Sequence, residues 1–294
     1  MDTGCLAELK AHSVKVGSNP DLVQGSGGNT SWKFDQTVWV KGSGRRLKDA
    51  TSEDIFSLIN FAALSTEDIL AIRDFSNLTL NAISPSIEAN LHLFLRSKFV
   101  THLHSLGSIA IGVSERNYEF KTLYENAIFV PYARPGVELV NSINRIEGHE
   151  NKVLILQNHG LIISGQESGE IESKIEIFEN QVSEYFTKTL HDEELPNWIE
   201  ILTSGVLTPD EAVFLGKTPF VKSEVVLSNS VGINSKGELL FPKSFSADRV
   251  ELATFFMRVA KLIERKTPIN YLSKSEVHDL LEWDKEKIRI AMAK

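Results

Sequence analysis

The chain has 294 residues, of which 42% are hydrophobic and 24% charged, and its formal net charge is −8. These values are typical of a globular protein with one large domain, or one domain and a substantial extension. The negative charge argues against a nucleic-acid partner, which usually requires a clustered basic surface. Cys5 is the single cysteine, so no disulfide can form within the chain.

The N-terminal residues lack the basic flank and apolar core of a secretory signal. No apolar run approaches the roughly 18 residues of a membrane-spanning helix. We therefore expect a cytoplasmic protein that has no membrane partner.

Hydrophobic spacing predicts the elements of the first two thirds of the chain. Residues 1–17 have helical spacing, and a glycine-rich loop then leads into two short strands, TSWKF and TVWVK. Helices are predicted over 52–64 and 84–98, where helix-start residues precede an apolar periodicity. Further predicted elements are the strands FVTHLHS, IFVPY and VLILQNHGLIIS and a long amphipathic helix over 168–191.

A change of composition follows residue 191. The remaining part is mixed, with a strand candidate VVLSNSVGI and helical spacing over 246–266 and 273–293. We therefore predict two units: residues 1–195 as a catalytic domain, and residues 196–294 as a C-terminal α/β extension packed on it.

Two histidines, His102 and His104, lie in the predicted strand FVTHLHS. Side chains two residues apart in a strand point to the same face, so the two imidazoles project together. Such a pair can share a divalent metal ion. Two packed core histidines with backbone partners are an equally good interpretation of this motif alone.

His159 shifts the balance towards a metal. It lies between Asn158 and Gly160 inside an apolar stretch, where polar groups carry a desolvation cost unless a partner compensates for it. Three histidines are the ligand set of a catalytic zinc site with one open position. Gly160 permits close approach of the backbone.

A carboxylate for acid–base chemistry is available at Glu88, in the first turn of the helix predicted over 84–98. His92 is four residues further on and shares the same face. We assign a function to Glu88 and treat His92 as an ordinary helix residue. Lys41 could instead act as a Schiff-base nucleophile, but that interpretation leaves the three histidines unexplained.

Six motifs occur in an order that resembles the class II aldolase/adducin family: GSGGNTS, VKGSG, PSIEANLH, THLHS, VPYARPG and LILQNHGLI. The resemblance covers about residues 5–190. The stretch WVKGSG and the C-terminal part with LTPDEAVFLG are most similar to the aldolase portion of bifunctional rhamnulose-phosphate aldolase/dehydrogenase proteins.

The resemblance implies a three-layer α/β/α fold with a central, mostly antiparallel sheet, one Zn²⁺ per subunit and a homotetramer. It implies that His102, His104 and His159 are the zinc ligands and that Glu88 is the catalytic carboxylate. It places the phosphate of a sugar substrate in a cradle formed by Asn29, Ser43, Gly44 and Ser86. Lys41, or the pair Arg45 and Arg46, could add a cation to this phosphate site.

The implied activity is retro-aldol cleavage of a ketose 1-phosphate or a related sugar phosphate or sugar acid through a metal-stabilised enediolate. The family has two adjacent serines before the catalytic glutamate, but here Ile87 replaces the second, so the substrate phosphate is open to question. A 4-epimerase or dehydratase of the same family and a non-catalytic adducin-like scaffold are the alternatives. The glutamate at position 88 favours the aldolase over the epimerase.

Overall fold

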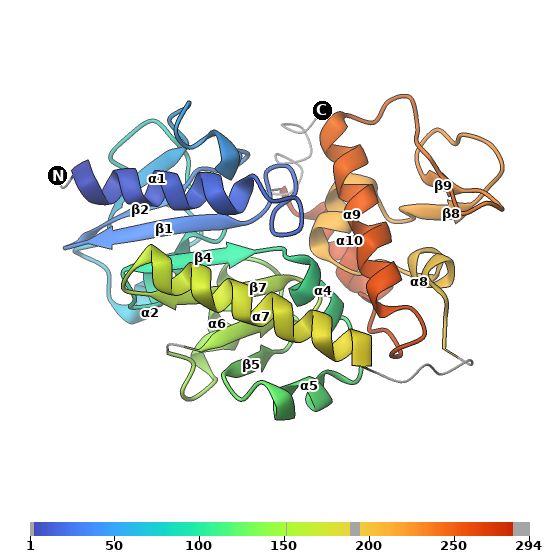
Figure 1. Cartoon of the computed structure of the whole chain (residues 1–294). Coiled ribbons are helices and arrows are strands. Elements are labelled where there is room, and N and C mark those ends of the chain that lie inside the picture. The colour runs from blue at the N-terminus through green and yellow to red at the C-terminus, as the bar shows by residue number, and fades with distance from the viewer. Residues whose placement is uncertain (1–2, 151, 189–194, 285–294) are drawn as a thin grey trace.

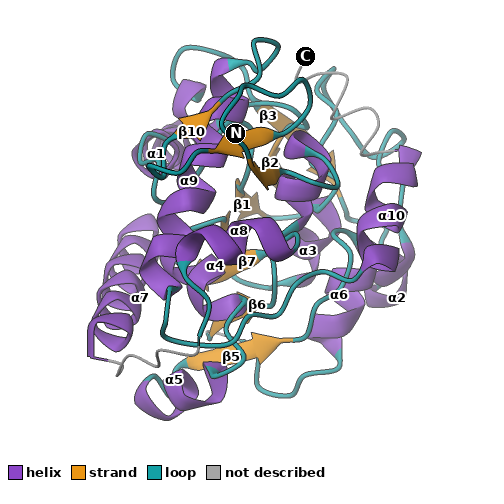
Figure 2. Cartoon of the chain, turned by 90° about the vertical axis from the view of Figure 1, so that its right-hand side faces the viewer, coloured by secondary structure: helices purple, strands orange, loops and turns teal. Residues whose placement is uncertain are grey.

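The computed structural model describes residues 3–150, 152–188 and 195–284 and shows an α/β protein with helices on both faces of a central sheet (Figures 1 and 2). The helices are α1 (Thr3–Gly17), α2 (Thr66–Ala71), α3 (Ala89–Phe94), α4 (Leu106–Gly112), α5 (Asn117–Leu123), α6 (Val137–Asn144), α7 (Ser168–Lys188), α8 (Trp198–Ser204), α9 (Ala247–Ile263) and α10 (Lys274–Glu282). Within the described residues, none of the helices is long and apolar enough to cross a membrane.

The central sheet has seven strands in the order β3-β2-β1-β4-β7-β6-β5. Its strands are β1 (Asn29–Phe34), β2 (Thr37–Lys41), β3 (Phe56–Asn60), β4 (Phe99–Leu103), β5 (Ala127–Val130), β6 (Val153–Leu156) and β7 (Gly160–Gly165). Every neighbouring pair is antiparallel except β5 and β6. The predicted three-layer fold with a mostly antiparallel sheet is confirmed.

Helices α1, α4 and α7 pack on one face of this sheet, and α2, α3 and α6 lie on the other (Figure 2). Strand β4 shows the alternation that divides the two faces. Phe99 and Leu103 belong to the core beneath α1 and α7, whereas Val100 packs in the core beneath α3. His102 is two residues beyond Val100 and therefore faces α3.

The C-terminal part forms a second α/β layer beside the central sheet, at the right of Figure 1. Its three-stranded sheet has the order β10-β9-β8. Phe255 and Phe256 of α9 belong to the same buried cluster as Leu9 of α1 and Phe178 of α7. The predicted C-terminal α/β extension is thus present and shares a core with the central layers. The strands are β8 (Phe220–Lys222), β9 (Val231–Ile233) and β10 (Leu239–Leu240).

The domain boundary at residue 195 stays a prediction, because it adjoins residues 189–194, which lie outside the described part of the chain. The predicted helix over 1–17 is confirmed from Thr3 onwards, whereas residues 1–2 lie outside the described part of the chain. The strands TSWKF and TVWVK and the long helix as far as Lys188 are also confirmed. The ends of two predicted helices, 189–191 and 285–293, also lie outside the described residues.

The helix predicted over 52–64 is wrong. Residues Phe56–Asn60 form β3, which pairs with the whole length of β2. The apolar spacing of this stretch also suits a helix. Here the hydrogen bonds to β2, whose backbone edge would otherwise lack partners, favour a strand instead.

Other predicted elements differ from the structure in their extent or in their kind. The helix over 84–98 begins only at Ala89, because the residues before it run alongside β2, with the Ser86 N–H donating to the Lys41 carbonyl. The stretch 153–164 is a hairpin of β6 and β7 rather than one strand. In VVLSNSVGI only Val231–Ile233 form a strand.

Candidate active site

Three buried histidines from different parts of the central sheet meet at one point. His102 lies in β4, His104 directly follows β4, and His159 ends the turn between β6 and β7. The ring centroids of His102 are 4.8 Å from those of both His104 and His159, and the His104 and His159 centroids are 5.2 Å apart. Within the described residues, one nitrogen from each ring lies within 4.8 Å of the others, which is close enough to hold one metal ion.

Local backbone geometry brings His159 to the other two rings. Asn158 has a φ of +55°, and this left-handed residue lets the chain turn between β6 and β7. A Cβ at position 160 would lie 2.2 Å from the Leu103 carbonyl oxygen. Only glycine therefore allows the start of β7 to approach the end of β4, and this contact sets the distance between the histidines.

The hydrogen bonds of the rings show which nitrogen faces the shared point. His102 Nδ1 lies 2.9 Å from the Leu161 carbonyl oxygen, and His104 Nδ1 lies 2.9 Å from Asp210 Oδ2. Both partners accept hydrogen bonds, so each Nδ1 carries a proton and each neutral ring keeps its Nε2 lone pair.

The two Nε2 atoms of His102 and His104 lie 3.0 Å apart. Two lone pairs at this distance repel each other unless a proton or a cation lies between them. A divalent cation that prefers imidazole nitrogen suits this arrangement, and Zn²⁺ is such an ion. The donor set therefore fits a metal.

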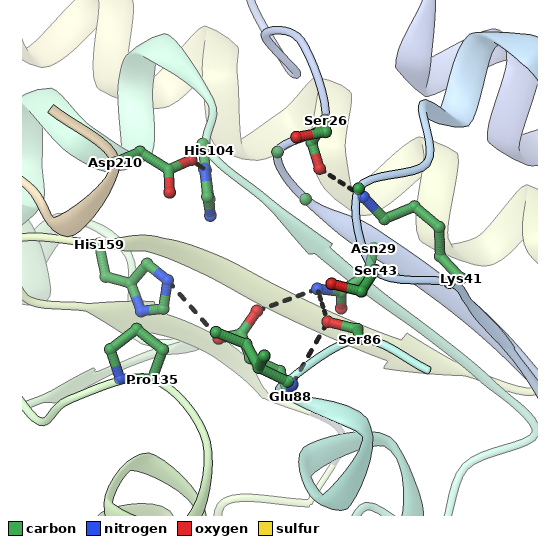
Figure 3. A pocket seen from close by; sticks show the side chains of 15 residues that line it. Ser26, Asn29, Lys41, Ser43, Ser86, Glu88, His104, Pro135, His159 and Asp210 are labelled. Atoms are coloured by element: carbon green, nitrogen blue, oxygen red, sulfur yellow. Dashed lines mark hydrogen bonds and ion pairs between the residues drawn. The ribbon is translucent and has the colours of Figure 1, made fainter. Parts of the chain in front are cut away.

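Glu88 lies at the N-terminal end of α3 and faces the cavity that His104 and His159 also line (Figure 3). Its Oε2 is 3.5 Å from His102 Nε2, and its Oε1 is 3.5 Å from His159 Nε2. The Asn29 side-chain amide donates a 2.9 Å hydrogen bond to Oε2. Glu88 is 6% exposed, so the carboxylate is held in a fixed position inside the site.

Burial and charge act on these groups in opposite directions. Burial alone raises the pKa of Glu88, but His102, His159, His104 and the Asn29 hydrogen bond together lower that pKa to about 2. Burial lowers the pKa of His102, and it lowers the pKa of His159 to about 3. At neutral pH the carboxylate is therefore ionised and these two imidazoles are neutral, which is the state in which they bind metal.

Strand register explains why Asn29 reaches Glu88. Asn29 pairs directly with His102 across β1 and β4, so both side chains lie on the face covered by α3. His92 Nε2 bonds the Asn29 side-chain oxygen, and His92 Nδ1 lies 2.7 Å from Ser31 Oγ. Burial lowers the pKa of His92 well below its usual value. The structure thus places His92 behind Asn29, on the side away from the three rings.

The residues expected to bind phosphate line one cavity together with Glu88, His104 and His159 (Figure 3). Ser86 Oγ is 3.4 Å from Asn29 Nδ2. The Ser43 N–H is already donated to the Ser84 carbonyl. The expected residues that line the cavity are Asn29, Lys41, Ser43, Gly44 and Ser86.

Lys41 is buried beside this cavity, and its Nζ donates to the carbonyl oxygens of Ser26, at 2.5 Å, and Arg45, at 2.9 Å. The ammonium therefore connects the glycine-rich loop before β1 to the loop after β2. Two carbonyl acceptors favour the protonated amine, which is not nucleophilic, so the contacts argue against a Schiff-base role.

Among the residues that line the cavity, Ser26, Pro135 and Asp210 have side chains that the sequence did not indicate as part of a site. Pro135 belongs to the motif VPYARPG and Asp210 to the stretch LTPDEAVFLG, so both lie in stretches that carry the resemblance. No sequence spacing connects residue 210 with residue 104, and only the packing of the C-terminal part brings them together.

Comparison with known proteins gives a family match over residues 11–185, to the class II aldolase and adducin N-terminal domain. This stretch contains the three histidines, Glu88 and the predicted phosphate-binding residues, but it excludes Asp210 and the rest of the C-terminal part.

Three relatives match this chain beyond chance, and two of them are the following. The L-fuculose phosphate aldolase of Methanococcus vannielii is 30% identical over an alignment of 171 residues that covers 53% of this chain and 82% of that protein. The uncharacterised oxidoreductase YuxG of Bacillus subtilis is 28% identical over an alignment of 211 residues that covers 64% of this chain. The match spans only 30% of the length of YuxG.

A solved structure shares the fold. The N-terminal class II aldolase domain of a conserved protein from Thermoplasma acidophilum is 25% identical, with a TM-score of 0.52. The match covers 63% of this chain and 94% of that domain.

Proposed function

This chain belongs to the class II aldolase/adducin family, and from that premise we propose that it is a zinc-dependent aldolase acting on a ketose 1-phosphate or a related sugar phosphate or sugar acid. The observation that carries the proposal is the convergence of three imidazoles on one point with a buried carboxylate facing them. The likeness to an L-fuculose phosphate aldolase supports the substrate class.

His102, His104 and His159 would hold the ion through their Nε2 atoms. When bound, Zn²⁺ supplies a Lewis acid that stabilises the negative charge left on the substrate oxygens when a carbon–carbon bond breaks. Neutral imidazoles suit this task because they leave the ion most of its positive charge.

Glu88 is the group we assign to proton transfer. Its carboxylate is ionised in the protein, so it can accept the proton of the substrate hydroxyl next to the bond that breaks, and return a proton to the carbon left behind. Asn29 holds Oε2 at 2.9 Å, and Oε1 has no hydrogen-bonding partner among the described residues. Oε1 is therefore the oxygen that we expect to take the proton.

The other end of the cavity is the place we propose for the phosphate. The Ser43 and Ser86 side chains, Gly44 and the nearby ammonium of Lys41 surround it. Hydroxyl and ammonium groups bind phosphate well, and a substrate held there has its reactive carbons near Glu88 and the histidines. Ile87, at a position where the resemblance implies a serine, leaves one hydroxyl group fewer at this end.

We further propose that the chain assembles as a homotetramer, as the resemblance implies. Sedimentation velocity on the purified protein tests this directly, and a monomer at micromolar concentration would contradict it.

The experiment that tests the activity is a panel of ketose 1-phosphates, assayed for release of dihydroxyacetone phosphate before and after treatment with a chelator. We expect release from at least one substrate, loss of release after chelation, and recovery on adding Zn²⁺. Zinc-dependent interconversion of two sugar phosphates without net cleavage would instead identify an epimerase, and purified protein without stoichiometric metal would indicate a scaffold.

A further inference from the structure

Asp210 lies in the C-terminal part, outside the residues that match the family, and it contacts the histidine cluster directly. Its Oδ2 lies 2.9 Å from His104 Nδ1, and the two side chains are 9% and 8% exposed. The residues are 106 positions apart in sequence. Figure 3 shows Asp210 beside His104, on the opposite side of that ring from Glu88.

We propose that Asp210 is a positioning residue for His104, and that the C-terminal part thereby completes the metal site. The proposal rests on the metal site of the proposed function. A carboxylate that accepts the Nδ1–H of a ligating histidine fixes the tautomer and the ring plane, and it makes Nε2 a better donor to the metal.

The three rings are not held in the same way. His102 Nδ1 donates to a backbone carbonyl of the adjacent strand, which the sheet supplies. His159 Nδ1 is buried and has no hydrogen-bonding partner among the described residues. His104 follows the end of β4, and the described pairing of β4 with β7 stops at Leu103. The carboxylate of Asp210 therefore accepts the Nδ1–H of His104, as the Leu161 carbonyl accepts that of His102.

The segment that carries Asp210 is itself anchored to the turn that carries His159. Asn158 Nδ2 donates to the carbonyl oxygens of Leu207, at 2.8 Å, and Asn270, at 2.7 Å. The buried carboxylate of Glu211 accepts the Leu207 N–H at 2.5 Å. The backbone before Asp210 is thus fixed to the residue next to His159, so the positions of the carboxylate and of two of the rings are coupled.

The test measures Zn²⁺ affinity by competition with a chromophoric chelator, for the full-length wild type and for Asp210→Ala and Asp210→Asn. We expect Asp210→Ala to weaken binding by about 10- to 100-fold. Asp210→Asn keeps a neutral acceptor for the Nδ1–H, so it should lose less. The visible spectrum of the Co²⁺-loaded protein should change in both variants, because it reports the ligand field at the metal.

Asp248→Asn is the matched control. Asp248 lines a neighbouring cavity together with Asp210, but its carboxylate pairs with Arg46. The same chemical change there should leave the Zn²⁺ affinity and the Co²⁺ spectrum as in the wild type.

Wild-type affinity and an unchanged Co²⁺ spectrum in Asp210→Ala would overturn the inference while leaving the aldolase proposal intact. Equal losses in Asp210→Ala and Asp248→Asn would also overturn it, since they would show a general effect of removing charge. Tight zinc binding that depends on Asp210, in a protein that cleaves no ketose phosphate, would support the inference and contradict the proposed activity. A wild type that binds no zinc would overturn both.

Discussion

The part of the chain that matches the family, residues 11–185, and the described residues of the C-terminal part, 196–284, contribute to the site in different ways. The first supplies all three imidazoles, Glu88 and the expected phosphate cradle. The second supplies one carboxylate, Asp210, which reaches His104 from outside the matched stretch.

A family match can thus contain all the residues proposed for the chemistry without containing every residue that contacts them. The three histidines lie in or directly beside strands of the central sheet, where the strand register positions them. The C-terminal part shares the main core with those strands, so its side chains are fixed as firmly as the rest. Variants on each side of this division can separate the two contributions.

The largest effect is expected for His159→Ala, which removes one of the three proposed metal ligands from the family-matched part. Metal content of the purified protein should fall from about one ion per chain to near zero, because two imidazoles are too few to hold zinc tightly. Elemental analysis after dialysis measures this. His278→Ala, an exposed histidine of α10, is the control and should keep full metal content.

Glu88→Gln should separate catalysis from metal binding. Gln keeps the shape and the hydrogen bond from Asn29 but cannot accept a proton, so turnover should fall by roughly 10²- to 10⁴-fold. Zinc content should stay at the wild-type level. Loss of metal together with loss of turnover would show instead that Glu88 is a ligand.

The three histidines of the candidate site could be predicted from the sequence because they lie in short, recognisable patterns. His102 and His104 are two residues apart in a strand, and Gly160 marks the close approach beside His159. Asp210 has no such pattern, since its partner is determined by the packing of the C-terminal part on the sheet. The error at Phe56–Asn60 has the same origin, because only β2 decides that this stretch is a strand.

The shared core predicts that the two parts unfold together. Phe256 of α9 is 1% exposed and packs in the same cluster as Phe178 of α7. Phe256→Ala should therefore destabilise the whole protein by about 3–5 kcal/mol, as should Phe178→Ala. Scanning calorimetry should show one transition that shifts in both variants, with little shift in Phe34→Ala, whose side chain is 47% exposed. Two transitions, only one of which moves with Phe256, would mean that the parts are independent.

The smallest effect concerns two buried carboxyl groups, one in each part. Burial raises the pKa of Glu179 on α7 from 4.5 to about 7 and the pKa of Glu211 beside Asp210 from 4.5 to about 8, although backbone hydrogen bonds lower both in part. Each group binds its proton more tightly in the folded state, so the stability it contributes is complete below pH 4.5. That stability is lost as pH rises towards the folded pKa, at up to about 1.4 kcal/mol per pH unit.

Glutamine at these positions cannot ionise, so each variant should remove one component of this pH dependence. Glu179→Gln should flatten the fall in melting temperature only below about pH 7, whereas Glu211→Gln should flatten it up to about pH 8. Between pH 7 and 8 the difference in slope between the wild type and Glu211→Gln therefore reports Glu211. Thermal melts at half-unit pH steps measure this, and an unchanged slope between pH 7 and 8 in Glu211→Gln would show that Glu211 is ionised in the folded protein at neutral pH.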